Sequence, residues 1–263
     1  MGIGSLDRLV QMHDLLRPDI DYDRPPGGGE ALFDLVGDLR GKTVLDAGCG
    51  EAPHRQKIVE RGARWVGVDV AGRRASVHAG GDRLPFGEGA FDHVLCSAVL
   101  EHLPEPDTFL REMRRVLAEG GVLFGYSAFL EPLHGMSYFH ASHMGLEVLL
   151  LKNGFRPKRL WASHVGAGCQ IEAMLFPKRI PVVQPLVRFM LRLMGRALLA
   201  GNRWARELLA LSRGLSGEQR REERAMHRRL LSLRFACGFN FIAIKGELPE
   251  NVTSGYAAFV KEG

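Results

Sequence analysis

The segment 43–54, Thr-Val-Leu-Asp-Ala-Gly-Cys-Gly-Glu-Ala-Pro-His, constrains the fold of this chain more than any other stretch. A short apolar run ends at Asp46, Gly48 and Gly50 follow, and a helical pattern opens near Pro53. This order predicts a strand, a glycine turn and a helix. Glycines allow sharp turns and close approach of the backbone to a ligand, while the helix directs its free N–H groups at that ligand. The segment therefore predicts an α/β protein with a nucleotide-binding crevice.

A second buried strand is expected at residues 64–70, and it ends at Asp69. Its distance from the glycine turn suits a carboxylate that accepts both ribose hydroxyls of a nucleotide. A dinucleotide-binding fingerprint would place a small residue where this chain has Pro53, because the helix must pack tightly on the strand there. The dinucleotide interpretation is therefore less favoured.

The glycine turn resembles the first motif of class I S-adenosylmethionine (SAM)-dependent methyltransferases, D-x-G-C-G-x-G, although Ala52 stands where the third glycine is common. Later segments are similar to the family's other motifs in their usual order: Leu84-Pro85-Phe86, Phe91-Asp92, Leu100-Glu101-His102-Leu103 and Gly120-Gly121. The resemblance spans roughly residues 30–165, with a last matching strand near 235–245. The chain is similar to the small-molecule type of this family, and the motifs do not identify the methyl acceptor.

The resemblance implies an α/β fold with a Rossmann-like, seven-stranded, mostly parallel sheet. Its last strand is expected to be antiparallel, with helices on both faces and a helical insertion before that strand. The implied cofactor is S-adenosyl-L-methionine, and the implied product is S-adenosyl-L-homocysteine. The expected cofactor-binding residues are Asp46, Ala47, Gly48, Cys49, Gly50, Asp69, Val70, Asp82, Leu84 and Ser97.

Three of these carboxylates have a second interpretation. For Asp46 and Asp69, the alternative is that they only cap turns at strand ends. The family usually places an acid that binds the adenine amino group four residues before the Leu-Pro-Phe, where this chain has Gly80, and Asp82 lies two residues closer. Asp82 is therefore predicted either to take the adenine role or to be a turn-forming residue that bonds local N–H groups.

Four regions are expected along the chain: an N-terminal arm or lid at 1–29, the SAM-binding domain at 30–165 and 235–246, a basic helical insertion at 166–234, and a tail at 247–263. Within them, helices are predicted at 30–39, 53–61, 144–153 and 218–233, and from Pro106 until Gly120 stops the helix. Ser142 is expected to cap the third of these helices.

Charge is distributed unevenly, because the segment from Lys152 to Arg234 holds 18 Lys or Arg against 5 Asp or Glu. Inside it, the apolar stretch 186–199 carries Arg188, Arg192 and Arg196 on one helical stripe. Such a helix could roof the active site, form a homodimer surface, or lie on anionic lipid, with 180–212 as the membrane contact. Nucleic acid is a less favoured partner, because exposed aromatic residues are not interleaved with the charges.

Histidines supply the catalytic candidates, because a base assists methyl transfer to an alcohol and the pKa of histidine is near neutrality. His102 follows the expected strand 91–99, while His134 and His140 lie in the loop 129–143, which we expect to hold the acceptor. The alternatives are a structural histidine for the first and solvated loop histidines for the others. No histidine pair has a recognised ligand spacing, so no metal site is predicted.

Composition indicates an ordinary globular protein of 263 residues. The four cysteines form no C-x-x-C pair, so neither a disulfide framework nor a cysteine zinc site is indicated. The sequence shows no signal-peptide core, no myristoylation signal and no apolar stretch of about 18 residues. We expect a cytoplasmic protein, with peripheral contact to the inner face of the membrane as an open alternative.

Taken together, these features predict a SAM-dependent methyltransferase that acts on an oxygen, or less favourably a nitrogen, of a small-molecule, glycan or lipid-linked acceptor. Because the sulfonium already activates the methyl group, such an enzyme mainly aligns the acceptor and excludes water. Two other hypotheses stay open at this point: a non-catalytic SAM-binding protein that docks on anionic membrane, and an RNA methyltransferase.

Overall fold

A seven-stranded mixed sheet forms the centre of the structure, a computed structural model that describes residues 16–17, 19–131, 136–163, 189–190, 193, 212, 214–234 and 236–246. The strand order is β3-β2-β1-β4-β5-β7-β6, and β7 is antiparallel to both of its neighbours. The strands are β1 (Thr43–Ala47), β2 (Arg64–Asp69), β3 (Val77–His78), β4 (Phe91–Ser97), β5 (Leu117–Ala128), β6 (Phe155–Ala162) and β7 (Gly238–Lys245). This topology confirms the predicted fold class.

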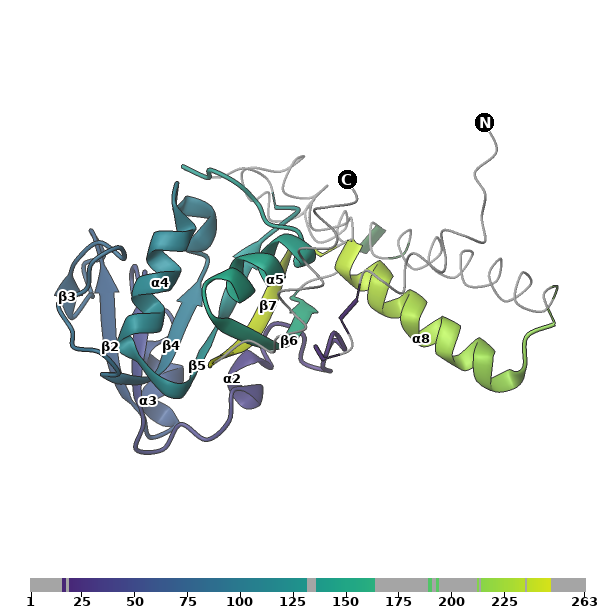
Figure 1. The fold of residues 1–263 in the computed structure, drawn as a ribbon, viewed down its shortest axis with the longest axis horizontal. Coiled ribbons are helices and arrows are strands. Elements are labelled where there is room, and N and C mark those ends of the chain that lie inside the picture. The colour runs from purple at the N-terminus through teal and green to yellow at the C-terminus, as the bar shows by residue number, and fades with distance from the viewer. Residues whose placement is uncertain are drawn as a thin grey trace.

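Helices cover both faces of the sheet, as Figure 1 shows with α4 and α5 in front of the strands. The helical segments are α2 (Leu32–Leu35), α3 (Arg55–Glu60), the 3-10 turn η1 (Leu100–His102), α4 (Pro106–Val116), α5 (His143–Lys152) and α8 (Gly217–Arg234). Neighbouring strand residues alternate between two cores, so that Leu45 packs with α4 and α5 while Val44 packs with α2 and α3. This alternation is the period-2 pattern of strands buried on both faces.

Several predicted helix bounds need correction. The helix expected at 30–39 is reduced to α2, because Gly37 adopts a left-handed φ of 102° and ends it, although Val36 and Leu39 remain buried. The helix after Pro106 ends at Val116 and not at Gly120, since Leu117 already has an extended backbone and begins β5. The helix at 53–61 is α3, which starts two residues later.

Two other predicted helices are present. The helix α5 begins as expected, because the Ser142 hydroxyl accepts the N–H of Gly145 at 3.1 Å. The basic helix predicted at 218–233 is α8, whose Leu230 and Leu233 are buried at its carboxyl end. Figure 1 shows the rest of α8 extending away from the sheet. The predicted helix at 186–199 and the tail 247–263 lie almost entirely outside the described residues.

The described part of the predicted N-terminal arm lies along β6, the last strand in the sheet order. The N–H of Asp21 donates to the carbonyl of Lys158 at 3.0 Å, and the N–H of Leu160 donates to the carbonyl of Asp21 at 2.9 Å. The carboxylate of Asp23 accepts two hydrogen bonds from Arg229 of α8 at 2.6 and 2.8 Å. The arm therefore covers the open edge of β6 and connects it to α8.

Candidate functional site

The first two strands bring their following loops together at one edge of the sheet. β1 and β2 are parallel and in register from Thr43–Arg64 to Ala47–Val68. The N–H groups of Gly48 and Cys49 both donate to the carbonyl of Val68, at 2.8 and 3.0 Å. The glycine turn is thus fixed against the end of β2, at the carboxyl edge where open α/β sheets bind ligands.

Gly48 and Gly50 adopt left-handed φ values of 74° and 50°, which favour glycine. A Cβ on Gly48 would collide with the Cγ2 of Val99, whereas a Cβ on Gly50 would meet no atom within 4 Å. The turn therefore requires glycine at both positions, and its backbone at Gly50 faces open space in which a ligand can approach.

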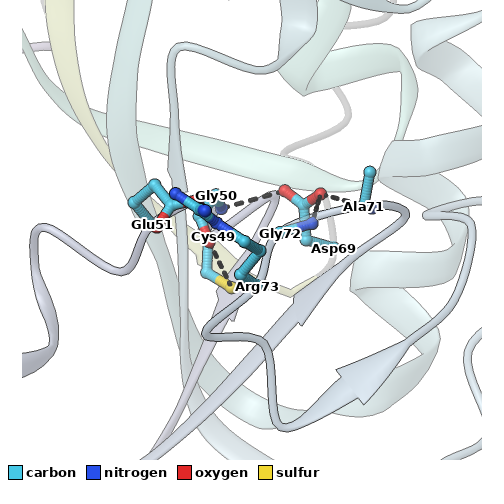
Figure 2. Close-up of polar contacts among 7 residues, drawn as sticks. All are labelled: Cys49, Gly50, Glu51, Asp69, Ala71, Gly72 and Arg73. Atoms are coloured by element: carbon cyan, nitrogen blue, oxygen red, sulfur yellow. Dashed lines mark hydrogen bonds and ion pairs between the residues drawn. The ribbon is translucent and has the colours of Figure 1, made fainter.

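Asp69 ends β2 and holds the loops together, as Figure 2 shows. One carboxylate oxygen accepts the N–H of Gly50 at 2.9 Å, and the other accepts those of Ala71 and Gly72 at 2.9 and 2.8 Å. Burial alone would raise the pKa of Asp69, but these three backbone donors lower it below the usual value. Asp69 is therefore ionised at neutral pH and can accept ligand hydroxyls.

Asp46 has a different environment from Asp69. Its side chain is only 2% exposed, and one oxygen accepts the indole N–H of Trp65 at 3.0 Å. Burial raises the pKa of Asp46 to about 6, with the Trp65 hydrogen bond acting in the opposite direction and the charge of Asp69 adding to the increase. Its partner Trp65 was not among the predicted site residues.

Asp82 lies next to the position at which the family usually has an acid. One of its carboxylate oxygens is 2.5 Å from where a Cβ of Gly80 would stand, so Asp82 occupies the space of that missing side chain. Leu84 is buried, and its N–H donates to Glu112 at 2.7 Å. Both predicted alternatives for Asp82 fit this placement.

The other predicted cofactor residues surround the same edge. Ala47 and Cys49 are buried beneath the turn, and burial raises the pKa of the Cys49 thiol to about 11. Val70 is 73% exposed beyond the end of β2. Ser97 ends β4, where it pairs with Tyr126 of β5. The structure thus collects these residues at the carboxyl ends of β1, β2 and β4.

His102 lies in η1, just after β4. Its Nδ1 is 3.0 Å from the carbonyl oxygen of Met136. Because a carbonyl only accepts hydrogen bonds, Nδ1 carries the proton in the neutral ring, and Nε2 is the proton-accepting nitrogen. This orientation is the one that a general base requires.

His140 is held within its own loop. Its Nδ1 is 2.8 Å from the carbonyl oxygen of Phe129, so its Nε2, 2.9 Å from the Ser137 hydroxyl, accepts that hydroxyl's hydrogen. These bonds fit a histidine that shapes the loop better than one that abstracts a proton. His134 lies outside the described residues.

Sequence reasoning gave no role to two buried polar side chains, Glu101 beside His102 in η1 and Asn240 of β7, which pairs with the half-buried Tyr126 of β5. The signal for Asn240 was present in the sequence, since it is a lone amide between Phe239 and Phe241 in an otherwise apolar strand. Glu101 belonged to a recognised motif but received no role. The residues that the structure describes contain no group of three metal-ligating side chains.

A cleft of about 380 Å³ lies at the opposite edge of the sheet, near the amino end of β5. It is lined by Glu88, Arg111, Arg114, Arg115, Glu119 and Lys245. Arg115 and Lys245 already pair with Glu112 and Glu119. The cleft is therefore separate from the loops at the carboxyl edge.

Two further findings concern the cysteines and the described helices. Cys237 is disulfide-bonded, although the cysteine spacing indicated no disulfide framework, while Cys49 and Cys96 are free. Among the described helices, none has the length and apolar character needed to cross a bilayer.

Comparison with known proteins gives consistent matches. Residues 45–125 match the family model described as a methyltransferase domain. An uncharacterized methyltransferase from Mycobacterium sp. (strain KMS) is 33% identical over 143 residues, covering 48% of this chain and 57% of that protein. The ubiquinone biosynthesis O-methyltransferase of Chromobacterium violaceum is 31% identical over 109 residues, covering 35% of this chain and 47% of that enzyme. The chain thus spans about half the length of these curated relatives.

Among solved structures, a SAM-dependent methyltransferase from Archaeoglobus fulgidus aligns with a TM-score of 0.51 and 17% sequence identity. The alignment covers 82% of this chain and 92% of that one. At this identity the likeness shows a shared fold.

Proposed function

Because residues 45–125 match the family model described as a methyltransferase domain, we propose that this chain is a class I SAM-dependent methyltransferase that transfers the methyl group of SAM to an oxygen of a small-molecule, glycan or lipid-linked acceptor. A nitrogen acceptor is the less favoured variant. The observation that carries the proposal is the convergence of the Gly48–Gly50 turn on the ionised Asp69 carboxylate. This pairing suits a nucleoside, since the backbone can approach it and the carboxylate can accept its ribose hydroxyls.

The residues present fit this cofactor. The open space before Gly50 admits a ligand against the backbone, and Asp69 supplies the acceptor for ribose. Asp82, beside Gly80, is the candidate for the adenine amino group. SAM supplies an electrophilic methyl group on a positively charged sulfur, so the protein's task is to align the acceptor and exclude water.

We assign His102 as the base for a hydroxyl acceptor. With SAM bound, the cofactor would supply its methyl group to the acceptor oxygen, and the hydroxyl proton would pass to Nε2 of His102. The bond between Nδ1 and the carbonyl of Met136 holds the ring in the required tautomer. S-adenosylhomocysteine is the product that leaves the site.

Substitution of Asp69 tests the cofactor assignment. Asp69→Ala should weaken SAM binding by about 100-fold or more, because hydrogen bonds to a charged acceptor contribute roughly 1.5–3 kcal/mol each. Asp69→Asn keeps one carbonyl oxygen for the backbone donors and should show an intermediate loss. Calorimetry gives both affinities, and circular dichroism checks that the variants are folded.

The matched control is Asp38→Asn, since Asp38 is exposed and pairs only with its neighbour Arg40 among the described residues. It should bind SAM as the parent protein does. Unchanged affinity in a folded Asp69→Ala variant would refute the assignment. Methyl-labelled SAM incubated with fractions of a host extract then identifies the acceptor class, because label should enter one fraction.

We also propose peripheral contact with anionic membrane through residues 180–212. The described residues of this segment include three exposed apolar side chains, Phe189, Met190 and Leu193, at 61%, 55% and 52% exposure. They lie among Arg188, Arg192 and Arg196 in the sequence. Apolar groups beside arginines are the pattern of a helix that lies in a lipid interface.

A further inference from the structure

Ser137 stands between two contacts that hold η1, the turn that carries His102. The carbonyl of Met136, in the peptide before Ser137, lies 3.0 Å from Nδ1 of His102. The N–H of Tyr138, in the peptide after Ser137, donates to the backbone carbonyl of Glu101 at 2.7 Å. Because each peptide is planar, only the φ and ψ angles of Ser137 relate the two contacts to each other. The conformation of this one residue therefore sets how the loop holds the proposed base.

The side chain of Ser137 is bonded to His140, and His140 is bonded to the residue that follows β5. The Ser137 hydroxyl donates to Nε2 of His140 at 2.9 Å, and Nδ1 of His140 donates to the carbonyl of Phe129 at 2.8 Å. A neutral imidazole is a rigid ring with one donor and one acceptor. It therefore bridges the two groups at a fixed separation and ties Ser137 to Phe129.

Phe129 is anchored to the sheet. Its N–H donates to the carbonyl of Cys237 at 2.8 Å, and its ring lies 5.2 Å, centroid to centroid, from the ring of Phe239 in β7. Phe239 is fully buried, and packed sheet regions open far less often than loops do. A continuous chain of contacts therefore runs from the sheet through Phe129, His140 and Ser137 to the two peptides that hold η1.

Apolar burial adds little to these contacts. The side chains of Met136 and Tyr138 are 79% and 58% exposed, while Ser137 and His140 are half-buried. Hydrogen bonds therefore contribute much of what holds residues 136–138 against η1. Loss of one of them should move this short segment without unfolding the protein, because segments with few buried apolar contacts open locally.

We propose that His140 is a positioning residue for the methyl transfer, which acts through Ser137 to fix the Met136 carbonyl that orients the ring of His102. A general base must lie within hydrogen-bonding reach of the proton that it takes, and small displacements of such a group are costly. Without His140, the Met136 carbonyl can shift, and the His102 ring can rotate or change tautomer. This inference rests on the proposed function, in which His102 is the base.

Two substitutions at His140 separate positioning from direct proton transfer. His140→Gln keeps one donor and one acceptor for Phe129 and Ser137, but an amide does not take a proton from a hydroxyl. His140→Ala removes both bonds. The assay uses methyl-labelled SAM and the extract fraction that the parent protein labels. His140→Ala and Ser137→Ala should lower the rate at saturating SAM about 10-fold or more, with the KM for SAM unchanged. His140→Gln should stay within about threefold of the parent rate.

A double substitution shows whether His140 acts through His102. If it does, the two residues are coupled, and His140→Ala should change the rate less than about twofold in a protein that already carries His102→Ala. A residue that merely stabilised the fold would cost the same rate in both backgrounds.

Nitrogen-15 NMR of the histidine rings gives a readout that needs no acceptor. In basic solution, where imidazole rings are neutral, His102 of the parent protein should carry its proton on Nδ1. In His140→Ala, the His102 signals should show a mixture of the two tautomers, because the Met136 carbonyl no longer selects one. His140→Gln should give the parent signals for His102.

Ser216→Ala is the control for Ser137→Ala. The Ser216 side chain is in an exposed residue, and its hydroxyl accepts the N–H of Gln219 at 3.3 Å. This variant should change neither the rate nor the His102 signals. S-adenosylhomocysteine should bind every variant within about twofold of the parent affinity, which shows that the cofactor site is intact.

Three results would overturn the inference. The first is an equal loss of rate in His140→Gln and His140→Ala, which would make His140 itself the base. The second is a full effect of His140→Ala in the absence of His102, and the third is identical His102 signals in His140→Ala and the parent. If the parent labels no fraction, the ring signals alone decide. A parent protein that does not bind S-adenosylhomocysteine is a separate result, which would refute the proposed function while the ring signals still test whether His140 orients His102.

Discussion

At the scale of single residues, backbone strain is concentrated in the loops that carry the proposed function. Ala52, in the glycine turn, and Ala98, directly after β4, adopt left-handed φ values of 56° and 55°. Residues other than glycine rarely adopt this backbone conformation. Ala52 stands at the third glycine position of the motif that this turn resembles, and its left-handed φ is the conformation that glycine adopts most readily.

Gly48→Ala tests how tightly the glycine turn is constrained. The new Cβ would collide with the side chain of Val99 and would also be held at a φ of 74°. We expect a loss of about 2–4 kcal/mol in the free energy of unfolding, from strain of about 1 kcal/mol plus overpacking of about 1–3 kcal/mol. Chemical denaturation measures it, and SAM affinity should fall as well.

Gly41→Ala is a close control for this prediction. Its φ is 71°, but a Cβ there would meet no atom within 4 Å. The difference between the two variants therefore isolates the collision with Val99, and Val99→Ala should partly rescue Gly48→Ala. Equal destabilisation by both glycine substitutions would show that strain alone is responsible.

Asp46 should make the protein less stable as the pH rises. Its folded pKa of about 6 lies above the usual value for an aspartic acid side chain, so the folded state binds the proton more tightly. The penalty for its ionised form grows between about pH 4 and pH 6 and is complete above pH 6. It amounts to roughly 2–3 kcal/mol.

Asp46→Asn should remove this penalty while keeping an oxygen for the indole of Trp65. The variant should be more stable than the parent protein at pH 7.5 by up to about 2 kcal/mol, and about equally stable at pH 4.5. Urea denaturation at both values measures the difference. A gain of the same size at both pH values would contradict the assigned ionisation.

The sequence was most informative where site residues are close neighbours along the chain. The glycine turn and Asp69 were predicted because the motif and its spacing are local. Trp65 as the partner of Asp46, and the pairing of Tyr126 with Asn240, were not predicted. Those contacts depend on strand register between distant segments, which a single sequence does not reveal.

At the scale of elements, one buried contact connects the arm with α5. The hydroxyl of Tyr22, in the arm, donates to Glu147 of α5 at 2.7 Å. Burial raises the pKa of Glu147 to about 7, while Tyr22 and then Arg17 act to lower it. The arm thus supplies the hydrogen bond that allows this buried carboxyl group to ionise near neutrality.

Tyr22→Phe should therefore destabilise the fold more at high pH than at low pH. Above pH 7 the variant leaves an ionised, buried carboxylate without its donor, at a cost of about 1–3 kcal/mol. Below pH 7 Glu147 is protonated, and the cost should be smaller. Denaturation at pH 8.5 and pH 5.5 measures it, with Tyr138→Phe as the control because Tyr138 is 58% exposed. A larger loss at pH 5.5 would contradict this account.

Secondary structure was predicted best where a helix has its own start signal. Pro106 and Ser142 mark the starts of α4 and α5, and both were placed correctly. The end of α4 was misplaced because the turn residue Gly120 was taken as the stop, whereas strand pairing with β4 extends β5 back to Leu117. Tertiary pairing overrode the local signal there.

At the scale of the whole molecule, the strand order separates two sets of residues. Most of the proposed cofactor residues lie at the ends of β1 and β2, with Ser97 at the end of β4, while Tyr126 and Asn240 pair between β5 and β7. The arm and α8 attach to β6, beyond the second set. The arm and α8 thus both lie at the β6 end of the sheet.

Vesicle sedimentation tests the proposed membrane contact. The protein should pellet with anionic vesicles and not with neutral ones, because both apolar insertion and arginine charge contribute. Replacing Phe189, Met190 and Leu193 together by Ser should reduce binding at least about 10-fold, since a buried apolar side chain contributes about 1.5–3 kcal/mol. Val59→Ser removes an apolar side chain of 50% exposure elsewhere and should have no effect. If the triple variant pelleted with anionic vesicles as well as the parent protein does, this segment would not make the membrane contact.

The position of β7 between β5 and β6 also determines when the sheet can close during synthesis on the ribosome. Both neighbours are translated before β7, and the 75 residues 163–237 separate the end of β6 from its start. At roughly 5–20 residues per second, translation of this segment takes on the order of 4–15 s. Throughout that interval β6 has no neighbouring strand in the sheet and β5 keeps one unpaired edge, while the glycine turn and Asp69 can already assemble. The half of the molecule that would recognise the acceptor is thus the last to form in a nascent chain, and it is the half that chaperones would have to protect.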